Sequence, residues 1–395
     1  MAINDDRMQW PFFDETHRQL AKEAENWAAA NLANHKHPSE RPAVDAHCRA
    51  LVSGLGRAGL IRHCLRAADG GCAADFDARS ICLLRRALSY HDGLADFAFA
   101  MQGLGSAPIS LAGAEPVRAL WLPRVAAGTA IAAFALSEPE AGSDVAAMQA
   151  SARRDGGYYI LSGTKTWVSN GGIADFYCVF ARTAPGVRRA DGSISAEGIS
   201  AFVVKPGDAG FAIAGRIDAM APHPLARLTF EDCRIPQARL IGAEGEGFRI
   251  AMRTLDIFRT SVAGAACGFA RRALDEALAH ARGRAMFGRR LADFQLTQVA
   301  LAEMATGIEA AELLTFRAAW LHDRGLPFSS AAAMAKLTAT ESAQSVIDRA
   351  LQMFGGRGVV QGEIVERLYR EIRALRIYEG ASEVQKLLIG RELLK

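Results

Sequence analysis

The stretch Arg376-Ile-Tyr-Glu-Gly-Ala-Ser-Glu-Val-Gln385 lies near the C-terminus, between two segments with helical patterns. Ser382, followed three residues later by Gln385, matches a capping box, so we expect a last helix to begin there. Gly380 allows a tight turn just before it. Glu379 is therefore held at a loop-to-helix junction. There its carboxylate is either a general base or a surface charge that a helix N-terminus favours.

Length and composition limit what surrounds this stretch. The chain has 395 residues, of which 50% are hydrophobic, and this predicts two or three domains. No dense Lys/Arg run appears, so we expect no nucleic-acid partner. The scattered cysteines form no C-x-x-C pair, which argues against zinc and disulfide frameworks and favours a reducing, cytoplasmic location. Residues 1–10 are polar and the longest apolar run, 125–136, is too short to cross a bilayer, so we expect no membrane association.

The hydrophobic pattern changes twice along the chain. The first third reads as helices, residues 130–244 as short β-branched and aromatic runs, and the rest as long helices. We therefore predict an α+β multidomain protein with an N-terminal helical domain (1–129), a middle β-barrel or sandwich domain (130–244) and a C-terminal four-helix-bundle domain (245–395). The clearest predicted strands are 158–169, 176–182, 199–204 and 225–230, and the clearest predicted helices are 248–282, 294–321, 330–354 and 365–377.

Two segments of the β region have residues suited to a flat ligand. The loop 137–144, Ser-Glu-Pro-Glu-Ala-Gly-Ser-Asp, offers small residues and free backbone N–H groups, although an ordinary turn explains it equally well. In the segment 163–172, Trp167 and Ser169 are two residues apart and share one strand face. They either stack on and hydrogen-bond to a heteroaromatic ring, or they precede a hairpin turn as core residues.

Three segments of the helical C-terminal region have residues suited to an anionic ligand. Asp256 and Arg259 form either a simple intrahelical pair or a binding pair. Residues 284–288 with Gln295 place an arginine and exposed backbone at a turn. Such a turn can bind a phosphate, or the arginine simply complements the negative end of the preceding helix. The glycines at the end of 352–356 permit close approach of a ligand or simply end a helix. The sequence contains no metal-binding motif, G-x-G-x-x-G or P-loop.

In this order and at these spacings, the segments resemble the acyl-CoA dehydrogenase family over essentially the whole chain. Residues 137–144 and 377–385 are similar to its two signatures, and 167–172, 284–288 and 352–356 match its flavin-contacting stretches. The resemblance implies conversion of an acyl-CoA to the trans-2-enoyl-CoA, with Glu379 as α-proton base and N5 of FAD as hydride acceptor. It also implies electron transfer to an electron-transferring flavoprotein, and a homo-oligomer, usually a homotetramer, in which FAD is contacted across a subunit boundary.

The resemblance also assigns individual residues. It implies FAD contacts for Leu136, Ser137, Gly142, Ser143, Trp167, Ser169, Arg284, Phe287, Gln295, Gln352, Gly355, Gly356, Ser382 and Glu383. It implies contacts with the CoA thioester for Ser143, Asp256, Arg259, Tyr378, Gly380 and Arg391. No metal is implied. Burial against the flavin and the acyl chain is expected to raise the pKa of Glu379 toward the operating pH.

Departures from the family pattern leave several points open. Phe258 occupies the position where some branches carry the base, and Ala381 replaces the usual threonine after Glu-Gly. His223 is a substrate contact or a loop residue, and Asp96 faces a polar acyl group or solvent. The chain length of the acyl group is not specified.

Other functions fit parts of the same pattern. An acyl-CoA oxidase and a dehydrogenase for carrier-protein-bound acyl groups are alternatives within enzymes. A DNA-binding alkylation-response-type flavoprotein is the non-enzyme alternative, although no basic extension follows the last helix. A flavin monooxygenase of the same fold would lack the base at Glu379.

Overall fold

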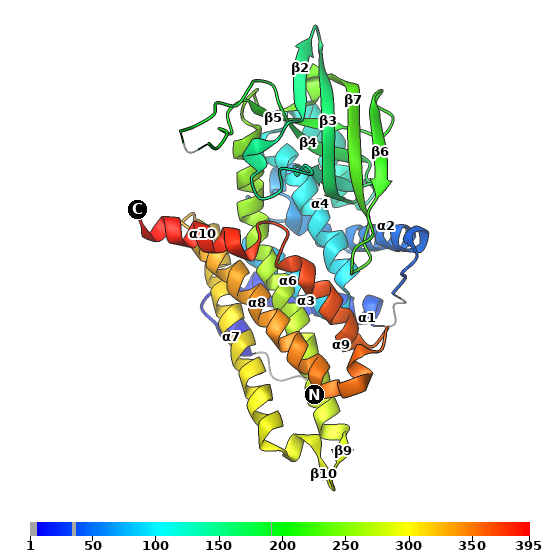
Figure 1. Ribbon diagram of the computed structural model, residues 1–395, viewed down its shortest axis with the longest axis vertical. Coiled ribbons are helices and arrows are strands. Elements are labelled where there is room, and N and C mark those ends of the chain that lie inside the picture. Colours follow the sequence, from blue (N-terminus) through cyan, green and yellow to red (C-terminus); the bar gives the residue numbers. More distant parts are fainter. Residues whose placement is uncertain (1–5, 34–36, 191) are drawn as a thin grey trace. The chain divides into compact units, whose positions relative to one another are not determined.

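The structure is a computed structural model that describes residues 6–33, 37–190 and 192–395, so part of the polar stretch 1–10 lies outside it. The chain divides into two compact units, each built from separate stretches (Figure 1). We call Met1–Lys36, Asp77–Asp96 and Ile257–Lys395 the helical unit, and His37–Phe76 with Phe97–Asp256 the sheet unit. Two helices, α4 (Gly93–Ala112) and α6 (Gly247–Gly283), contribute to both units.

The sheet unit is organised around one eight-stranded sheet with the order β6-β7-β3-β2-β4-β5-β8, in which β1 pairs with β4 in parallel. Strands β4 and β5 are nearly continuous apolar runs, because side chains on both of their faces are buried. In Figure 1, β2, β3, β7 and β6 run side by side as one twisted layer. The strands are β1 (Ala132–Ala135), β2 (Ser151–Asp155), β3 (Tyr158–Ser169), β4 (Phe176–Arg182), β5 (Ile199–Val204), β6 (Phe211–Arg216), β7 (Leu225–Pro236) and β8 (Leu240–Ile241).

The helices of the sheet unit pack closely because small residues lie where they meet. A Cβ atom added to Gly56 would lie 2.4 Å from the backbone nitrogen of Gly128, so a larger residue would push α2 away from the end of α5. Besides parts of α4 and α6, the unit contains α2 (Arg41–Arg57), α5 (Glu115–Ala126) and the short helices η2 (Leu60–Cys64), η3 (Ala67–Asp69), η4 (Val145–Ala147) and η5 (Gln237–Arg239).

The helical unit consists of long helices and one small hairpin. Its first long helix begins directly after Asp14, because Asp14 and His17 form a capping box. In Figure 1, α8 lies alongside α7, and α10 follows α9 after a tight loop. Besides parts of α4 and α6, the elements are η1 (Asp6–Gln9), α1 (Glu15–Leu32), α3 (Ala78–His91), β9 (Ala285–Met286), β10 (Arg289–Arg290), η6 (Leu291–Asp293), α7 (Gln295–Asp323), α8 (Ser329–Phe354), η7 (Gly355–Val359), α9 (Ile364–Leu375) and α10 (Ser382–Leu393).

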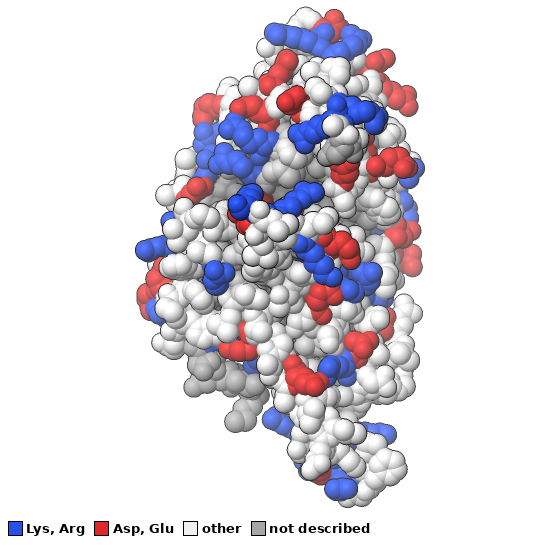
Figure 2. Space-filling view, turned by 60° about the vertical axis from the view of Figure 1, so that its left-hand side comes forward, with Lys and Arg blue, Asp and Glu red and all other residues white. Residues whose placement is uncertain are grey.

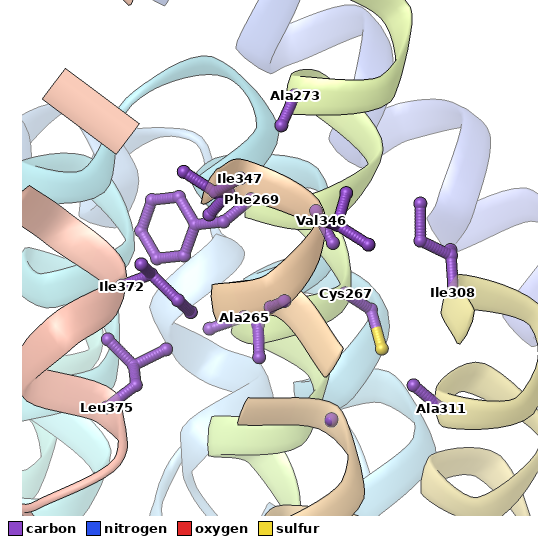
Figure 3. Close-up of a cluster of buried hydrophobic side chains, with 14 of the residues drawn as sticks. Ala265, Cys267, Phe269, Ala273, Ile308, Ala311, Val346, Ile347, Ile372 and Leu375 are labelled. Atoms are coloured by element: carbon purple, nitrogen blue, oxygen red, sulfur yellow. The ribbon is translucent and has the colours of Figure 1, made fainter. Parts of the chain in front are cut away.

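The core of the helical unit combines a few large side chains with many alanines. Phe269 of α6 packs near Ile347 of α8, with Ile372 and Leu375 of α9 facing them (Figure 3). Alanines cover much of the buried face of α8, which lets neighbouring helices approach closely. The resulting scaffold fixes the ends of α9 and α10, where the loop carrying Glu379 is attached.

The predicted succession of helical, β and helical segments is confirmed, as are the main strands and long helices. The strands β2, β6, β8, β9 and β10 were not predicted, and the exact domain boundaries stay a prediction. The capping box predicted at Ser382 is wrong: α10 begins after Ala381, and the Ser382 hydroxyl donates instead to Glu341, 2.5 Å away. Among the described residues, no helix is long and apolar enough to cross a membrane. Figure 2 shows positive and negative side chains scattered together over one face.

Candidate active site

The loop between α9 and α10 holds Glu379 in an unusual backbone conformation. Glu379 has a φ of +53° and Gly380 a φ of +92°. Glycine adopts this left-handed region freely, but a glutamate there costs conformational energy. The surrounding structure must therefore hold Glu379 in place.

Three side chains hold the backbone carbonyls of this loop. Lys336 of α8 donates from Nζ to the Gly380 carbonyl at 2.7 Å, and Gln385 of α10 donates to the same oxygen at 2.8 Å. Arg259 of α6 makes a longer contact of 3.5 Å from Nε to the Glu379 carbonyl. The carbonyls of the two successive peptides on either side of Gly380 are thus tied to three helices, which fixes the orientation of the loop.

The carboxylate of Glu379 is available for chemistry. Its Oε2 atom is buried, and within the described parts of the chain it has no hydrogen-bond partner. Burial raises the pKa of this carboxyl above its ordinary value, while three nearby cations act in the opposite direction, in decreasing order Arg85, Lys336 and Arg259. A buried carboxylate with a raised pKa and an open acceptor atom is what a general base needs.

A buried ion pair supplies the strongest of these cations. Arg85 of α3 donates from Nε and one terminal nitrogen to the two carboxylate oxygens of Asp96 of α4, both at 2.8 Å. Its other terminal nitrogen donates to the hydroxyl of Ser261 on α6 at 3.0 Å. Both charged side chains are buried. Asp96 is therefore not exposed to solvent, and this excludes one of the two alternatives that the sequence left open for it.

In the sheet unit, a second buried ion pair fixes the segment that follows β1. Nζ of Lys165 lies 2.8 Å from Glu138 and donates to the Leu136 carbonyl at 2.9 Å. The same glutamate accepts hydrogen bonds from the backbone of Gln149 and Ala150. Burial lowers the pKa of Lys165 to about 8, although Glu138 favours its charged form. These contacts give Leu136 and Ser137 a defined position beside β3, where Thr166 donates its N–H to the Ser137 carbonyl.

Trp167 presents its ring on the outside of the sheet unit. A bulge in the pairing of β3 with β7 lies between Lys165 and Val168, and Trp167 has a φ of +55° and is 62% exposed. Ser169 is half-buried two residues later. An exposed indole and a nearby hydroxyl can stack on and hydrogen-bond to a flavin ring, so these residues fit FAD.

A separate group of predicted cofactor residues is exposed on the helical unit. The side chain of Phe287 is 86% exposed at the tip of the β9–β10 hairpin. A Cβ atom added to either glycine of the pair after α8 would meet no atom within 4 Å, so the backbone there is open to a ligand. The group consists of Arg284, Phe287, Gln295, Gln352, Gly355 and Gly356, all exposed.

The remaining predicted contacts are distributed over both units. In the sheet unit, Gly142 and Ser143 are exposed in the loop after β1, and Asp256 is half-buried on α6. In the helical unit, Tyr378 is exposed next to the base, Ser382 is buried at the start of α10, and Glu383 and Arg391 are exposed on that helix. His223 lies in a loop, where its ring packs against Phe97 at 4.7 Å.

Sequence reasoning missed Arg85, Lys336 and Gln385 as neighbours of the base. The sequence could have indicated that Lys336 is buried, because it lies on a face of α8 that is otherwise made of small residues such as Ala332, Ala333 and Ala339. Arg85 had none, because its partners come from two other helices.

An acidic group elsewhere does not need a metal. His17, Asp77 and Asp323 bring their ligand atoms within 4.8 Å of one another. However, Asp77 accepts from His17 and caps α3, and Asp323 accepts from Arg79 and the backbone of Ala78. These carboxylates are already used in joining helices.

Comparisons with known proteins agree along the chain. Residues 14–129, 133–233 and 245–394 match the family models for the N-terminal, middle and C-terminal domains of acyl-CoA dehydrogenase. The human short-chain specific acyl-CoA dehydrogenase, a mitochondrial protein, is 37% identical over 388 residues, which cover 96% of this chain and 90% of that protein.

Solved structures match over nearly the full length. Butyryl-CoA dehydrogenase from Megasphaera elsdenii has a TM-score of 0.87 at 33% identity, covering 97% of this chain and 99% of that chain. A structure described as that of the electron transferring flavoprotein of Acidaminococcus fermentans has a TM-score of 0.86 at 36% identity. The match covers 97% of this chain and 99% of that chain. Two further matching structures are complexes with FAD and FADH2.

Proposed function

The chain belongs to the acyl-CoA dehydrogenase family, and from that premise we propose how it acts on its substrate. It is an acyl-CoA dehydrogenase that uses FAD. We propose that it forms the trans-2-enoyl-CoA by removing a proton from the α-carbon and a hydride from the β-carbon of an acyl-CoA.

The proposal for the base depends on one observation, the buried Oε2 atom of Glu379 that lacks a hydrogen-bond partner among the described residues. A thioester α-proton is weakly acidic, so the base must be desolvated and precisely placed. Glu379 would take that proton, and its own backbone N–H would donate to the thioester oxygen as negative charge develops there. The chemistry that bound FAD would supply is acceptance of the hydride from the β-carbon.

The chain's own residues would place the two reactants. We propose that Trp167, Ser169, Leu136 and Ser137 hold the flavin ring, and that the exposed group from Arg284 to Gly356 holds FAD bound to a neighbouring subunit. Gly142, Ser382 and Glu383 would complete the FAD contacts. Ser143, Asp256, Arg259, Tyr378, Gly380 and Arg391 would contact the CoA thioester.

We propose a short straight-chain substrate such as butyryl-CoA, because two of the similar proteins, the human short-chain specific acyl-CoA dehydrogenase and the butyryl-CoA dehydrogenase of Megasphaera elsdenii, are named for short acyl chains. An electron-transferring flavoprotein is the proposed acceptor, supported by the matching structure named for that protein. Exposed apolar side chains beside the hairpin, at Phe287, Leu296 and Val299, support a homo-oligomer, which we propose to be a tetramer. The seven cysteines, all within the described residues, form no disulfide, which supports a reducing compartment such as the cytoplasm.

The test is an anaerobic titration of the yellow protein with saturated acyl-CoAs of increasing length, together with carrier-protein thioesters. Bleaching of the flavin by butyryl-CoA is expected, and Glu379→Gln should abolish bleaching while FAD stays bound. Reoxidation by oxygen and by an electron-transferring flavoprotein, measured in parallel, separates a dehydrogenase from an oxidase. Failure of every thioester to bleach the flavin contradicts the proposed reaction.

A further inference from the structure

We infer that Lys336 is a positioning residue for the base: from α8 it fixes the Gly380–Ala381 peptide, one residue after the strained Glu379, and thereby the direction of the Glu379 carboxylate. The inference rests on the proposed role of Glu379. It concerns a residue that the signature stretch does not contain, because Lys336 lies 44 positions before Gly380 in the sequence.

The location of Lys336 is unusual for a lysine. Its side chain has 0% exposure and lies on the alanine-covered face of α8. An ammonium group without solvent is costly unless it is paired or hydrogen-bonded. Its hydrogen-bond acceptor here is a main-chain carbonyl, that of Gly380, at 2.7 Å. The lysine therefore stabilises a particular backbone conformation rather than an ordinary salt bridge.

The conformation that it stabilises is the strained one. With a φ of +53°, Glu379 would relax toward a more common conformation if the Gly380 carbonyl were released, and its carboxylate would move with it. Gln385 also donates to the Gly380 carbonyl, but it belongs to α10, the helix that directly follows the loop. Lys336 is anchored in a different helix, so it fixes the loop relative to the core of the helical unit.

Charge gives Lys336 a second effect on the base. Burial lowers the pKa of Lys336 to about 8, and Glu379 is the group that most favours its charged form, with Glu341 and Glu383 contributing in the same direction and Arg259 against. Conversely, Lys336, Arg85 and Arg259 lower the pKa of Glu379, whereas Asp96 raises it. Removing the lysine should therefore raise the pKa of the base as well as loosen its backbone.

The experiment compares Lys336→Met, which removes both donor and charge, with Lys336→Gln, which keeps an N–H donor on a shorter, neutral side chain. Lys386→Met, at an exposed lysine of α10, is the control. Hydrogen exchange of the segment 376–386 in the FAD-bound protein reports the backbone, and it needs no substrate. The rate of flavin bleaching by butyryl-CoA, followed from pH 6 to pH 9, reports the base.

We expect Lys336→Met to retain FAD, to exchange faster in residues 376–386 only, and to bleach about a hundredfold more slowly, the effect of a small misplacement of a reacting group. Its pH profile should shift to higher pH. Lys336→Gln should recover part of the rate without reversing the pH shift, and Lys386→Met should match the unaltered protein.

Unchanged exchange in residues 376–386 of Lys336→Met overturns the inference, and so does an unchanged pH profile. Loss of FAD from both Lys336 variants also overturns it, because the lysine is then needed for the fold as a whole. If the unaltered protein is not bleached by any thioester while exchange still rises in Lys336→Met, the proposed reaction fails but the backbone role of Lys336 stands.

Discussion

Arg85 and Asp96 form a buried bidentate ion pair in which both nitrogen–oxygen distances are 2.8 Å, and the pair acts on the base in opposite directions. The guanidinium lowers the pKa of Glu379 and the carboxylate of Asp96 raises it. The pair is close to neutral as a whole, so its two effects on the pKa of Glu379 partly cancel. The pKa of Glu379 can therefore stay raised, as a proton acceptor needs. Removing one member should therefore change the pH dependence in a known direction.

We expect Asp96→Asn to shift the pH profile of flavin bleaching to lower pH. The substitution removes the negative charge but leaves Arg85, so the pKa of Glu379 falls. Leaving a buried charge without its partner should also destabilise the protein by about 3–5 kcal/mol. Both effects can be measured, by stopped-flow bleaching across pH and by urea unfolding.

The control for this prediction is Asp218→Asn. Asp218 also forms a two-point pair with an arginine, Arg41, but both side chains are exposed. Solvent screens such pairs, so stability should hardly change. If Asp96→Asn is as stable as Asp218→Asn, or if its pH profile moves to higher pH, our account of the buried pair is wrong.

A second prediction concerns the segment that we assign to the flavin. Lys165→Met removes the donor to the Leu136 carbonyl and leaves Glu138 buried without its cation. We expect a loss of about 3–5 kcal/mol of stability and faster release of FAD, measured by urea unfolding and by the fluorescence of freed flavin.

Arg249→Met is the matched control for Lys165, because Arg249 pairs with Glu246 at an exposed site of the same unit. It should leave both stability and FAD release unchanged. If Lys165→Met is less stable but its folded fraction releases FAD at the normal rate, Lys165 stabilises the fold and does not help to hold FAD. That outcome would count against our assignment of Leu136 to the flavin site.

A third prediction tests the packing of the helical unit. A Cβ atom added to Gly268 of α6 would lie 2.2 Å from the carbonyl oxygen of Arg86 on α3. Because backbone cannot yield as a flexible side chain can, Gly268→Ala should destabilise the protein by about 1–3 kcal/mol or more. Thermal unfolding followed by circular dichroism measures this.

The control is Gly390→Ala on α10, where an added Cβ atom meets nothing within 4 Å. Alanine is the better helix former, so this variant should be as stable as the original protein or more stable by about 0.5–1 kcal/mol. Equal melting temperatures for the two variants would show that α3 and α6 are not in close contact at Gly268.

Elements that depend on local sequence patterns were predictable, whereas features that depend on contacts between distant residues were not. Strands such as 176–182 and helices such as 330–354 were predictable because their signals are local periodicities bounded by glycine or proline. The short strand β8 and the hairpin β9–β10 were missed, since a two-residue strand has no periodicity.

The same distinction applies to the site. Glu379 and Trp167 lie in recognisable stretches, so the sequence indicated them as candidates. Arg85 lies 176 residues from Ser261, and only the packing of α3 against α6 brings the two together. The capping box failed at Ser382 because a competing partner, Glu341 of α8, lies close enough to accept its hydroxyl hydrogen.

A last prediction follows from the raised pKa of Glu379 itself. A carboxyl whose pKa is higher in the folded than in the unfolded protein makes its ionised form unfavourable to folding. The penalty is absent below the ordinary pKa of about 4.5, grows as the pH rises through the interval up to the raised value, and is constant above it. Glu379→Gln removes the charge and with it the penalty.

We therefore expect Glu379→Gln to be inactive yet more stable than the original protein at pH 8, with a smaller gain at pH 5. Urea unfolding at the two pH values measures the difference, and Glu392→Gln, an exposed glutamate of α10, should show no gain at either. A Glu379→Gln protein that is less stable at pH 8 would mean that Arg85, Lys336 and Arg259 outweigh the burial of the carboxylate. Glu379 would then be a stabilising charge, and its readiness to accept a proton would need another source.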